Sequence, residues 1–351
     1  MSSTPAAIRE WQNVTPDLFY EQILPLNQPA VLRGLVEHWP AVQAGRQSAQ
    51  AMSAYLSRFD NGSSTPVTLG DASIGGRFFY NDAMTGFNFE RRRQPLATTL
   101  RSLLDAVDDP RPPAIYMSAL PEGDNLPGFS RENPMALLPP SVAARVWIGN
   151  RVTVQTHYDL TGNVACVVAG HRRFTLFPPE QVTNLYVGPL EFTLAGTPTS
   201  LVKLEAPDYG KYPRFREAQA AAQTADLGPG DAIFVPYMWW HHVEALSNFN
   251  VLVNYWWAET PRWAGSPFEA MVHAMLAVRS LPERQRAVWR TFFEHYVFLA
   301  NGESAEHLPP DRRGIQSPPT AQGAAMMRSY LLERLTREQQ LSEPQGPAGP
   351  R

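Results

Sequence analysis

Residues 151–177, RVTVQTHYDLTGNVACVVAGHRRFTLF, decide the fold class of this chain. They contain three short runs rich in β-branched and aromatic residues, Arg151–His157, Val164–Ala169 and Arg173–Phe177, which are separated by turn-forming residues. Two further runs of the same kind follow at Ala232–Val235 and Val251–Trp257. Short strands at this spacing are typical of an antiparallel sandwich or barrel. The sequence therefore predicts β-structure from about residue 146 to residue 257.

Helical segments are expected on both sides of this β-region. Toward the N-terminus the patterns predict helices at Thr15–Leu24, Ser48–Phe59 and Leu96–Val107, and short β-pieces at Ala30–Arg33, Pro66–Leu69, Arg77–Tyr80 and Ala114–Ser118. Toward the C-terminus they predict a helix from Pro282 to about Asn301 and another at Ala321–Gln340. A long irregular stretch, 178–228, interrupts the strands and is expected to be a binding surface.

Composition excludes several classes of protein. The chain has 351 residues, of which 44% are apolar and 18% charged, and a net charge of −3, so neither a disordered nor a strongly basic, polyanion-binding protein fits. Its single cysteine, Cys166, excludes an intramolecular disulfide framework and a multi-cysteine zinc site. The longest apolar run in the middle of the chain, Val164–Ala169, is too short to span a membrane. With no apolar signal segment near the start, we expect a soluble, cytoplasmic protein.

The residues that suggest chemistry are His157, Asp159 and the pair His241-His242. His157 and Asp159 are two residues apart at the end of a predicted strand, so both side chains should point to the same side. A second histidine from a neighbouring strand would complete the facial triad of non-haem Fe(II) oxygenases. Strand alternation lets only one of His241 and His242 face such a metal. A lone His-x-Asp is common by chance, and a packed, hydrogen-bonded histidine pair is the ordinary alternative.

Ten short motifs occur in one order between about residues 12 and 260. They are Gln28–Gly34 (QPAVLRG), Trp39-Pro40, His157-Tyr158-Asp159, Gly170–Phe174 (GHRRF), Leu176–Pro179 (LFPP), Pro207-Asp208-Tyr209, Tyr212-Pro213, Pro229-Gly230-Asp231, Pro236–His242 (PYMWWHH) and Asn254-Tyr255-Trp256. On these motifs the chain resembles the JmjC-type, cupin-like Fe(II)- and 2-oxoglutarate-dependent oxygenases. Within that family it resembles the group of the asparaginyl hydroxylase called factor inhibiting hypoxia-inducible factor.

The resemblance implies a double-stranded β-helix (cupin or jelly-roll) barrel, and the helical patterns add flanking and C-terminal helices, so the expected fold is mainly β with flanking helices. Three regions are expected: an oxygenase domain at 1–260 with an N-terminal α/β elaboration, a helical region at 261–342 from its periodicity, and a disordered tail at 343–351 from its composition. The resemblance makes His157, Asp159 and His241 the iron ligands, with His242 as a neighbour that does not bind the metal. The cofactors implied are Fe(II), the cosubstrate 2-oxoglutarate, and O2.

The resemblance also implies residues that bind the cosubstrate and the substrate. Arg172 stands where the family has a lysine that neutralises the distal carboxylate of 2-oxoglutarate, and arginine can form the same salt bridge. Asn163, Asn254 and Tyr116 match positions near the cosubstrate. The family often has a threonine where this chain has Val154, so the neighbouring Thr156 is a further candidate. Trp256, Tyr80 and Trp239 are the candidates for the substrate pocket, and the loop at 207–216 could line a substrate groove.

The implied function is dioxygenase hydroxylation of a C–H bond, most simply in a protein or peptide side chain. Relatives also act on a modified tRNA base or demethylate lysine, but a net charge of −3 offers no basic stripe for nucleic acid. A small-molecule substrate stays open, as do two other classes: a non-oxidative metal-binding cupin, such as an isomerase or sensor, and a catalytically silent interaction module. Apolar positions in the last helix could pack on the barrel or form a homodimer.

Overall fold

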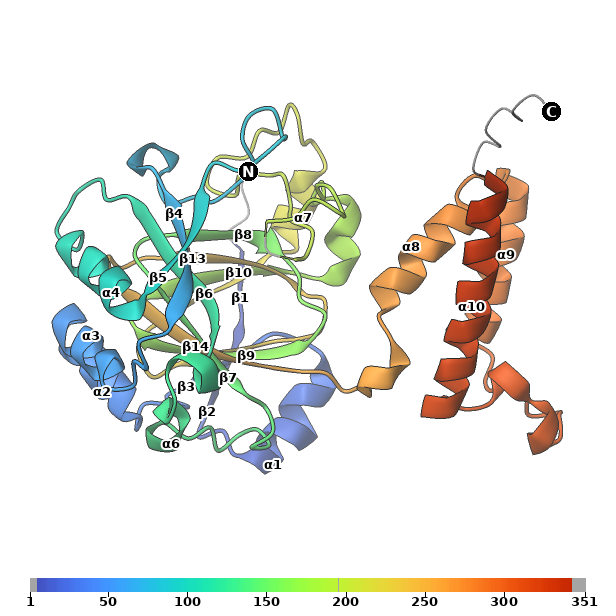
Figure 1. Cartoon of the computed structure of the whole chain (residues 1–351), viewed down its shortest axis with the longest axis horizontal. Coiled ribbons are helices and arrows are strands. Elements are labelled where there is room, and N and C mark those ends of the chain that lie inside the picture. Colours follow the sequence, from blue (N-terminus) through green and yellow to red (C-terminus); the bar gives the residue numbers. More distant parts are fainter. Residues whose placement is uncertain (1–4, 195, 343–351) are drawn as a thin grey trace, which may run out of the picture. The chain divides into compact units, whose positions relative to one another are not determined.

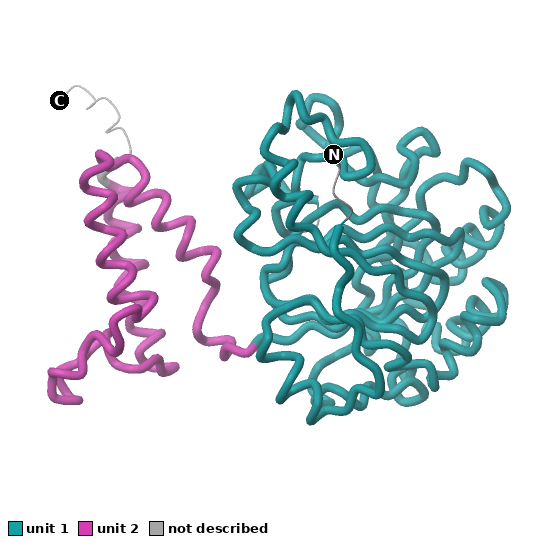
Figure 2. The backbone as a smooth tube through the Cα atoms, turned by 180° about the vertical axis from the view of Figure 1, so that it is seen from behind, with its two compact units in different colours: residues 1–258 teal, residues 259–351 magenta. Residues whose placement is uncertain are grey.

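The computed structural model describes residues 5–194 and 196–342, so the predicted disordered tail at 343–351 lies outside the described residues. The chain divides into two compact units, with the boundary between Ala258 and Glu259 (Figure 2). Within the described residues, no helix combines the length and the apolar character that crossing a membrane demands.

The described residues of the first unit form two β-sheets (Figure 1). The five-stranded sheet has the order β1 (Ala6–Ala7), β11 (Gln223–Leu227), β10 (Arg172–Phe177), β13 (Trp240–Ala245) and β8 (Thr153–His157). The nine-stranded sheet has the order β2 (Arg9–Gln12), β3 (Ala30–Arg33), β12 (Ala232–Val235), β9 (Gly162–Ala169), β14 (Asn250–Trp257), β7 (Ala144–Gly149), β6 (Ala114–Pro121), β4 (Ser64–Gly70) and β5 (Glu90–Pro95). The predicted fold class, a cupin-like jelly roll followed by C-terminal helices, is confirmed.

Strand β9 shows why the apolar run at its centre has no polar alternation. Val164, Cys166 and Val168 belong to the hydrophobic cluster on the outer face of the large sheet. Ala165 and Val167 belong to a second cluster, which contains residues of both sheets. A strand buried on both faces is apolar at successive positions. Ala165 and Val167 therefore face the space between the two sheets.

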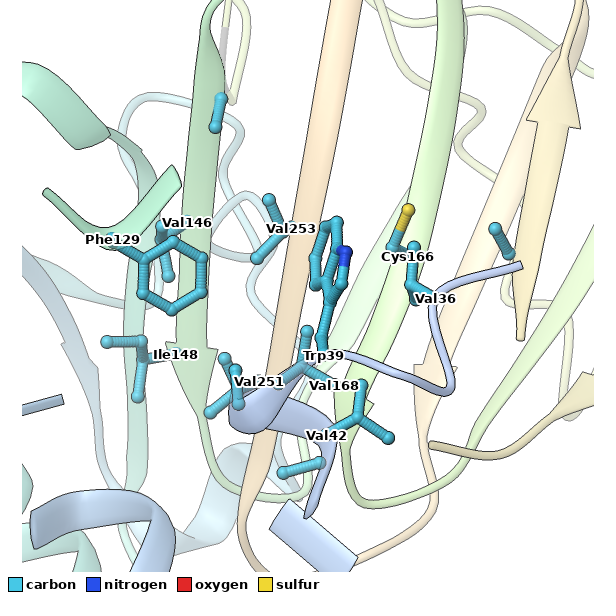
Figure 3. Packing of buried hydrophobic residues seen from close by; sticks show 14 of the residues in the cluster. Val36, Trp39, Val42, Phe129, Val146, Ile148, Cys166, Val168, Val251 and Val253 are labelled. Atoms are coloured by element: carbon cyan, nitrogen blue, oxygen red, sulfur yellow. The ribbon is translucent and has the colours of Figure 1, made fainter. Parts of the chain in front are cut away.

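Short helices complete the first unit. They are α1 (Pro16–Leu18), α2 (Pro40–Gln47), α3 (Ala49–Ser57), α4 (Leu96–Asp105), α5 (Glu122–Asn125), α6 (Phe129–Glu132) and α7 (Phe215–Ala220), with a π-helical turn at Phe19–Ile23 and 3₁₀ turns at Leu24–Leu26, Ala72–Ile74 and Pro179–Thr183. Trp39, just before α2, is fully buried between Cys166 of β9 and Val253 of β14 (Figure 3). Its indole Nε1 donates to the carbonyl oxygen of Pro134 at 2.9 Å, so the α2 segment is fixed on the sheet.

The structure corrects the boundaries of several predicted elements. Residues 77–80 form no strand, and only isolated bridges join Arg77 to Thr153 and Tyr80 to Phe87. The helix predicted at Thr15–Leu24 is one turn of α-helix, capped by the Thr15 hydroxyl, and continues as π and 3₁₀ turns. The stretch 178–228, which was predicted to be irregular, contains α7 and β11.

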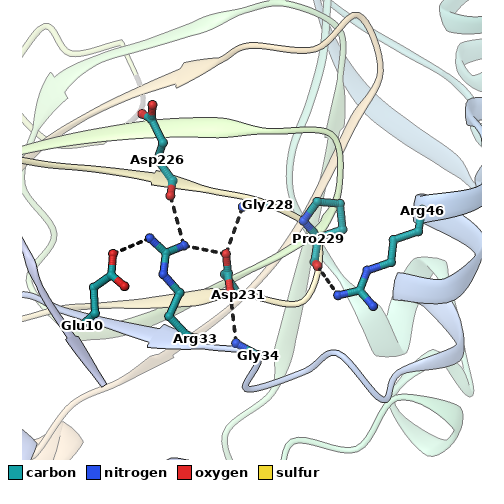
Figure 4. Close-up of polar contacts among 8 residues, drawn as sticks. All are labelled: Glu10, Arg33, Gly34, Arg46, Asp226, Gly228, Pro229 and Asp231. Carbon is teal, nitrogen blue, oxygen red and sulfur yellow. Dashed lines mark hydrogen bonds and ion pairs between the residues drawn. The ribbon is translucent and has the colours of Figure 1, made fainter. Parts of the chain in front are cut away.

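The Pro-Gly-Asp turn before β12 is held by a polar network (Figure 4). The Asp231 carboxylate accepts from the Arg33 guanidinium at 2.7 Å and from the backbone N–H groups of Gly34 and Gly228 at 3.1 and 3.2 Å. Arg33 also donates to Glu10 at 2.6 Å. Gly230 has a φ of +105°, and a Cβ there would lie 3.1 Å from the Cα of Glu37, so only glycine fits. This network joins β2, β3, β11 and β12.

Replacing Asp231 with alanine is expected to lower the free energy of unfolding by about 2 kcal/mol, because it removes three acceptor contacts that are partly shielded from water. Urea denaturation monitored by circular dichroism measures this loss. The matched control is Asp226→Ala, which removes an exposed pair with Arg173 and should cost less than about 1 kcal/mol. Equal losses in the two variants would contradict the role of the network.

In its described part, residues 259–342, the second unit contains three helices, α8 (Pro267–Val278), α9 (Glu283–Tyr296) and α10 (Ala321–Ser342), with 3₁₀ turns at Arg262–Ala264, Pro310–Arg312 and Gly314–Gln316. Neither α8 nor α9 contains a buried residue. Large apolar side chains are exposed on or beside all three helices, among them Leu276 at 68%, Phe298 at 72% and Leu332 at 68%. This unit thus shows apolar surface that an isolated helical domain would ordinarily cover.

Candidate metal centre

Two histidines meet because β8 and β13 are antiparallel neighbours in which His157 is paired with His241. Their ring centroids lie 4.2 Å apart. Each ring uses Nδ1 for a backbone carbonyl: His157 bonds to Gln155 at 2.8 Å and His241 to Trp239 at 3.0 Å. A neutral imidazole that donates through Nδ1 keeps a lone pair on Nε2. Both rings are therefore oriented to bind a metal through Nε2.

Asp159 completes a cluster of three possible ligands. It lies just beyond β8, where its carboxylate oxygens are 3.9 Å from the Nε2 of His157 and 3.7 Å from the Nε2 of His241. One ligand atom from each of the three residues lies within 4.8 Å of the others. Two imidazole nitrogens and one carboxylate oxygen are the donor set of the facial triad, which leaves other coordination positions open. The residues present thus fit a divalent iron.

Burial and the nearby His241 lower the pKa of His157 to about 4. A metal ligand must be the neutral imidazole, because the protonated ring has no free lone pair. A lowered pKa therefore keeps His157 ready to bind a metal over the whole neutral range.

His242 lies on the other face of β13. Its Nδ1 is 3.2 Å from the hydroxyl of Thr156, and its Nε2 is 3.3 Å from the carboxylate of Glu205. The contact with His242 lowers the pKa of Glu205 to about 2. The Thr156 hydroxyl, which was predicted to contact the cosubstrate, points to His242 and is not among the residues that line the metal cavity. Val154 takes the inward position on β8 instead.

Arg172 brings an uncompensated positive charge into the same cavity. Its side chain projects inward from β10, is only 1% exposed and lines the small space that also contains the triad. Within the described part of the chain, its Nε and Nη2 atoms have no hydrogen-bond partner. Burial lowers the pKa of Arg172, and the nearby Tyr116 hydroxyl offsets this in part. A buried, unpaired guanidinium is costly unless an anion joins it, so this arrangement points to an anionic ligand.

The remaining cosubstrate candidates surround the same space. Tyr116 of β6 contacts Arg172, and burial raises the pKa of its hydroxyl to about 12, so it stays a neutral hydrogen-bond donor. Asn163 of β9 and Asn254 of β14 both line the cavity, and their side chains meet at 3.4 Å. These polar groups all project from the two sheets toward one volume.

Of the three substrate-pocket candidates, only Trp256 lines this cavity. Its indole nitrogen is buried and has no hydrogen-bond partner in the described residues. The other two candidates lie elsewhere, and their substrate role stays a prediction. The Tyr80 hydroxyl donates to the carbonyl of Phe192 at 2.5 Å, and its ring packs on Phe87. Trp239 follows the turn at Pro236 and belongs to the hydrophobic cluster between the sheets.

Sequence reasoning missed Trp147 of β7, although it contributes to the cavity wall. Its ring packs 5.8 Å from both Tyr116 and Trp256, and its Nε1 donates to the Oδ1 atom of Asn254 at 2.7 Å. Trp147 approaches the cavity because β7 pairs with β14, and a single sequence does not reveal that pairing. The loop at 207–216, predicted to line a groove, contributes no residue to this cavity.

Comparison with known proteins places the site in a family context. Residues 16–262 match the profile of the family described as "Cupin-like domain". This match covers more than half of the chain and contains every residue of the candidate site.

Three similar proteins illustrate the range of relatives. Lysine-specific demethylase 8 of Xenopus tropicalis is 25% identical over 68% of this chain and 50% of its own length. The human bifunctional peptidase and (3S)-lysyl hydroxylase JMJD7 is 29% identical over 69% of this chain and 81% of its own length. The tRNA wybutosine-synthesizing protein 5 of Gallus gallus is 36% identical over 30% of each chain. The matched region spans half of the length of the Xenopus demethylase and less than a third of the length of the Gallus protein.

Proposed function

Because the chain belongs to the cupin-like, JmjC-type domain family, we propose that it is an Fe(II)- and 2-oxoglutarate-dependent dioxygenase that hydroxylates a C–H bond of its substrate. The observation that carries this proposal is the unpaired, buried guanidinium of Arg172 in the cavity that contains the His157, Asp159 and His241 cluster. The cluster supplies a metal site and the guanidinium supplies an anion site. A small dicarboxylate that also chelates a metal needs both.

His157, Asp159 and His241 would hold the metal. When bound, Fe(II) would supply the activation of O2 and the oxidative decarboxylation of 2-oxoglutarate to succinate and CO2, with the second oxygen atom entering the substrate as hydroxyl. The backbone carbonyls of Gln155 and Trp239 orient the two imidazoles before a metal arrives. This preorganisation fixes the ring orientation and strengthens the nitrogen donors.

Arg172 and Tyr116 would bind the distal carboxylate of the cosubstrate. The free Nε and Nη2 atoms of Arg172 can donate two parallel hydrogen bonds, and the neutral Tyr116 hydroxyl can donate a third. Asn163 and Asn254 offer amide groups on the wall of the same cavity. Trp147 and Trp256 pack beside them and exclude water.

The test is succinate formation by the full-length protein supplied with Fe(II), ascorbate, air and 2-oxoglutarate. We expect succinate to accumulate catalytically and to disappear when Zn(II) replaces Fe(II), because zinc is not redox-active. Stoichiometric binding of metal with no succinate under any condition would contradict the proposal and favour a non-oxidative cupin.

A protein or peptide side chain is the proposed substrate class. Two relatives carry names that refer to lysine, one as a demethylase and one as a hydroxylase, and hydroxylation of a peptide is the reaction we assign here. The narrower assignment, to the group of the asparaginyl hydroxylase, rests on the sequence motifs alone.

We also propose that the second unit forms a homodimer. Leu276, Phe298 and Leu332 are exposed apolar side chains that a second copy would cover. Light scattering coupled to gel filtration should give twice the 39.2 kDa chain mass, and Leu332→Glu should shift the population toward the monomer. A monomeric wild-type protein would contradict this proposal.

A further inference from the structure

An apolar chamber lies directly against the metal cavity. The two share the side chains of Tyr116, Trp147, Val154 and His157 as walls. Phe78, Phe89 and Leu194 are the other large apolar residues on the chamber wall, and the chamber volume is about 110 Å³. An apolar cavity of roughly 150 Å³ accepts a molecule of benzene, so this chamber has room for one aliphatic side chain.

A larger and more polar cavity of about 470 Å³, the opening, adjoins the chamber. Thr68, Arg91, Ser118 and Leu194 line both spaces. The opening, the chamber and the metal cavity thus form a path of adjoining spaces, with Arg91 on the walls of the first two and His157 on the walls of the last two.

Arg91 is the one Lys, Arg, Asp or Glu side chain among the described residues that line the opening and the chamber. Its guanidinium lies 5.3 Å from the ring centroid of Phe89 and donates to the backbone carbonyl of Leu194. In the described residues it has no carboxylate partner, whereas the adjacent Arg92 pairs with Glu90 at 2.6 Å. The aromatic face and the carbonyl hold the Arg91 cation in place without neutralising it.

We propose that the substrate is an acidic peptide segment that places a neutral, apolar side chain in the chamber and a carboxylate on Arg91. This inference rests on the proposed dioxygenase function, and it names the substrate class for that site. A lysine side chain fits poorly, because its ammonium group would find no carboxylate along the path and would pass the cation of Arg91. The chain thus differs from those relatives whose names refer to lysine.

A nucleic acid is the less favoured partner. Binding to nucleic acid relies on several cations that neutralise successive phosphates. The opening presents Arg91 as its charged side chain in the described residues, and Arg92 beside it is already paired. One guanidinium matches one carboxylate better than it matches a row of phosphates.

The experiment compares two fluorescein-labelled peptides with a central leucine, one flanked by glutamates and one by lysines. Fluorescence anisotropy measures their binding to the full-length protein loaded with Mn(II) and 2-oxoglutarate without O2. We expect the glutamate peptide to bind about tenfold more tightly, which corresponds to about 1.4 kcal/mol. Arg91→Ala should remove this preference and Arg91→Glu should reverse it, whereas Arg92→Ala, the matched control, should keep it.

Two further probes complete the test. A glutamate-flanked peptide with a central lysine should bind more weakly than its leucine counterpart, and a single-stranded RNA should not compete with the peptide. Tighter binding of the lysine-flanked peptide, equal binding of both peptides, effective competition by RNA, or an Arg91→Glu variant with wild-type preference would each overturn the inference. Succinate formation is measured separately, so failure of the dioxygenase proposal shows as absent turnover, and failure of this inference shows in the anisotropy.

Discussion

Replacing Asp159 with alanine is expected to reduce succinate formation by at least about 10³-fold while leaving the fold intact. The substitution removes the carboxylate from a cluster of three possible ligands, and two imidazoles alone hold a divalent metal weakly. The carboxylate contacts His157 and His241 at 3.9 and 3.7 Å. Its loss therefore changes the metal site and leaves the hydrophobic clusters unchanged.

Asp226→Ala is the matched control for this prediction. It removes an aspartate whose carboxylate pairs with Arg173 on the outside of the small sheet. We expect this variant to keep its turnover. Circular dichroism and thermal unfolding of the metal-free proteins test whether both variants fold. An Asp159→Ala variant that turns over at the wild-type rate would remove Asp159 from the metal site.

Replacing Arg172 with methionine is expected to raise the 2-oxoglutarate concentration for half-maximal turnover by about 10²-fold. The variant removes two free, buried guanidinium donors that would pair with a carboxylate, a contact worth about 3 kcal/mol. Succinate formation at increasing 2-oxoglutarate measures the effect. Arg172→Lys is the matched control, because it keeps the charge, and it should retain most of the affinity. An unchanged requirement in Arg172→Met would remove Arg172 from the cosubstrate site.

The same substitution should act in the opposite direction on the stability of the ligand-free protein. Arg172 is buried with two nitrogens unpaired in the described structure, which is unfavourable without an anion. We expect Arg172→Met to raise the free energy of unfolding of the ligand-free protein by about 1 kcal/mol. A gain in stability together with a loss of cosubstrate affinity separates a ligand-binding role from a structural one.

The fold was predictable because its strands have simple patterns. Strand β9 is apolar on both faces, and His157 and His241 face one another because β8 and β13 are neighbours. The adjacent His242 then necessarily faces the opposite way, toward Glu205. Strand periodicity and the family motifs together were sufficient for these features.

The errors arose where the backbone departs from regular strands. The pairing of β8 with β13 shifts between His241 and Val243, so that both His157 and Val154 face the cavity. Strict alternation cannot reveal this bulge, and it would place Val154 on the face away from His157. Thr156 was proposed because it flanks Val154, and its hydroxyl lies 3.2 Å from the Nδ1 atom of His242. Trp147 was missed for another reason: it approaches the site through the pairing of β7 with β14, two strands that are distant in the sequence. Arg91 was missed because its strand, β5, was not predicted.

The most direct test of the account is whether the metal and 2-oxoglutarate share one site. Isothermal titration without O2 can measure 2-oxoglutarate binding to the wild-type protein loaded with Mn(II), to the same protein stripped with a chelator, and to Asp159→Ala. We expect one cosubstrate per chain in the loaded protein, and affinity at least about tenfold weaker in the other two. Equal affinity in all three samples would contradict the central claim that the His157, Asp159 and His241 cluster and Arg172 bind one cosubstrate together.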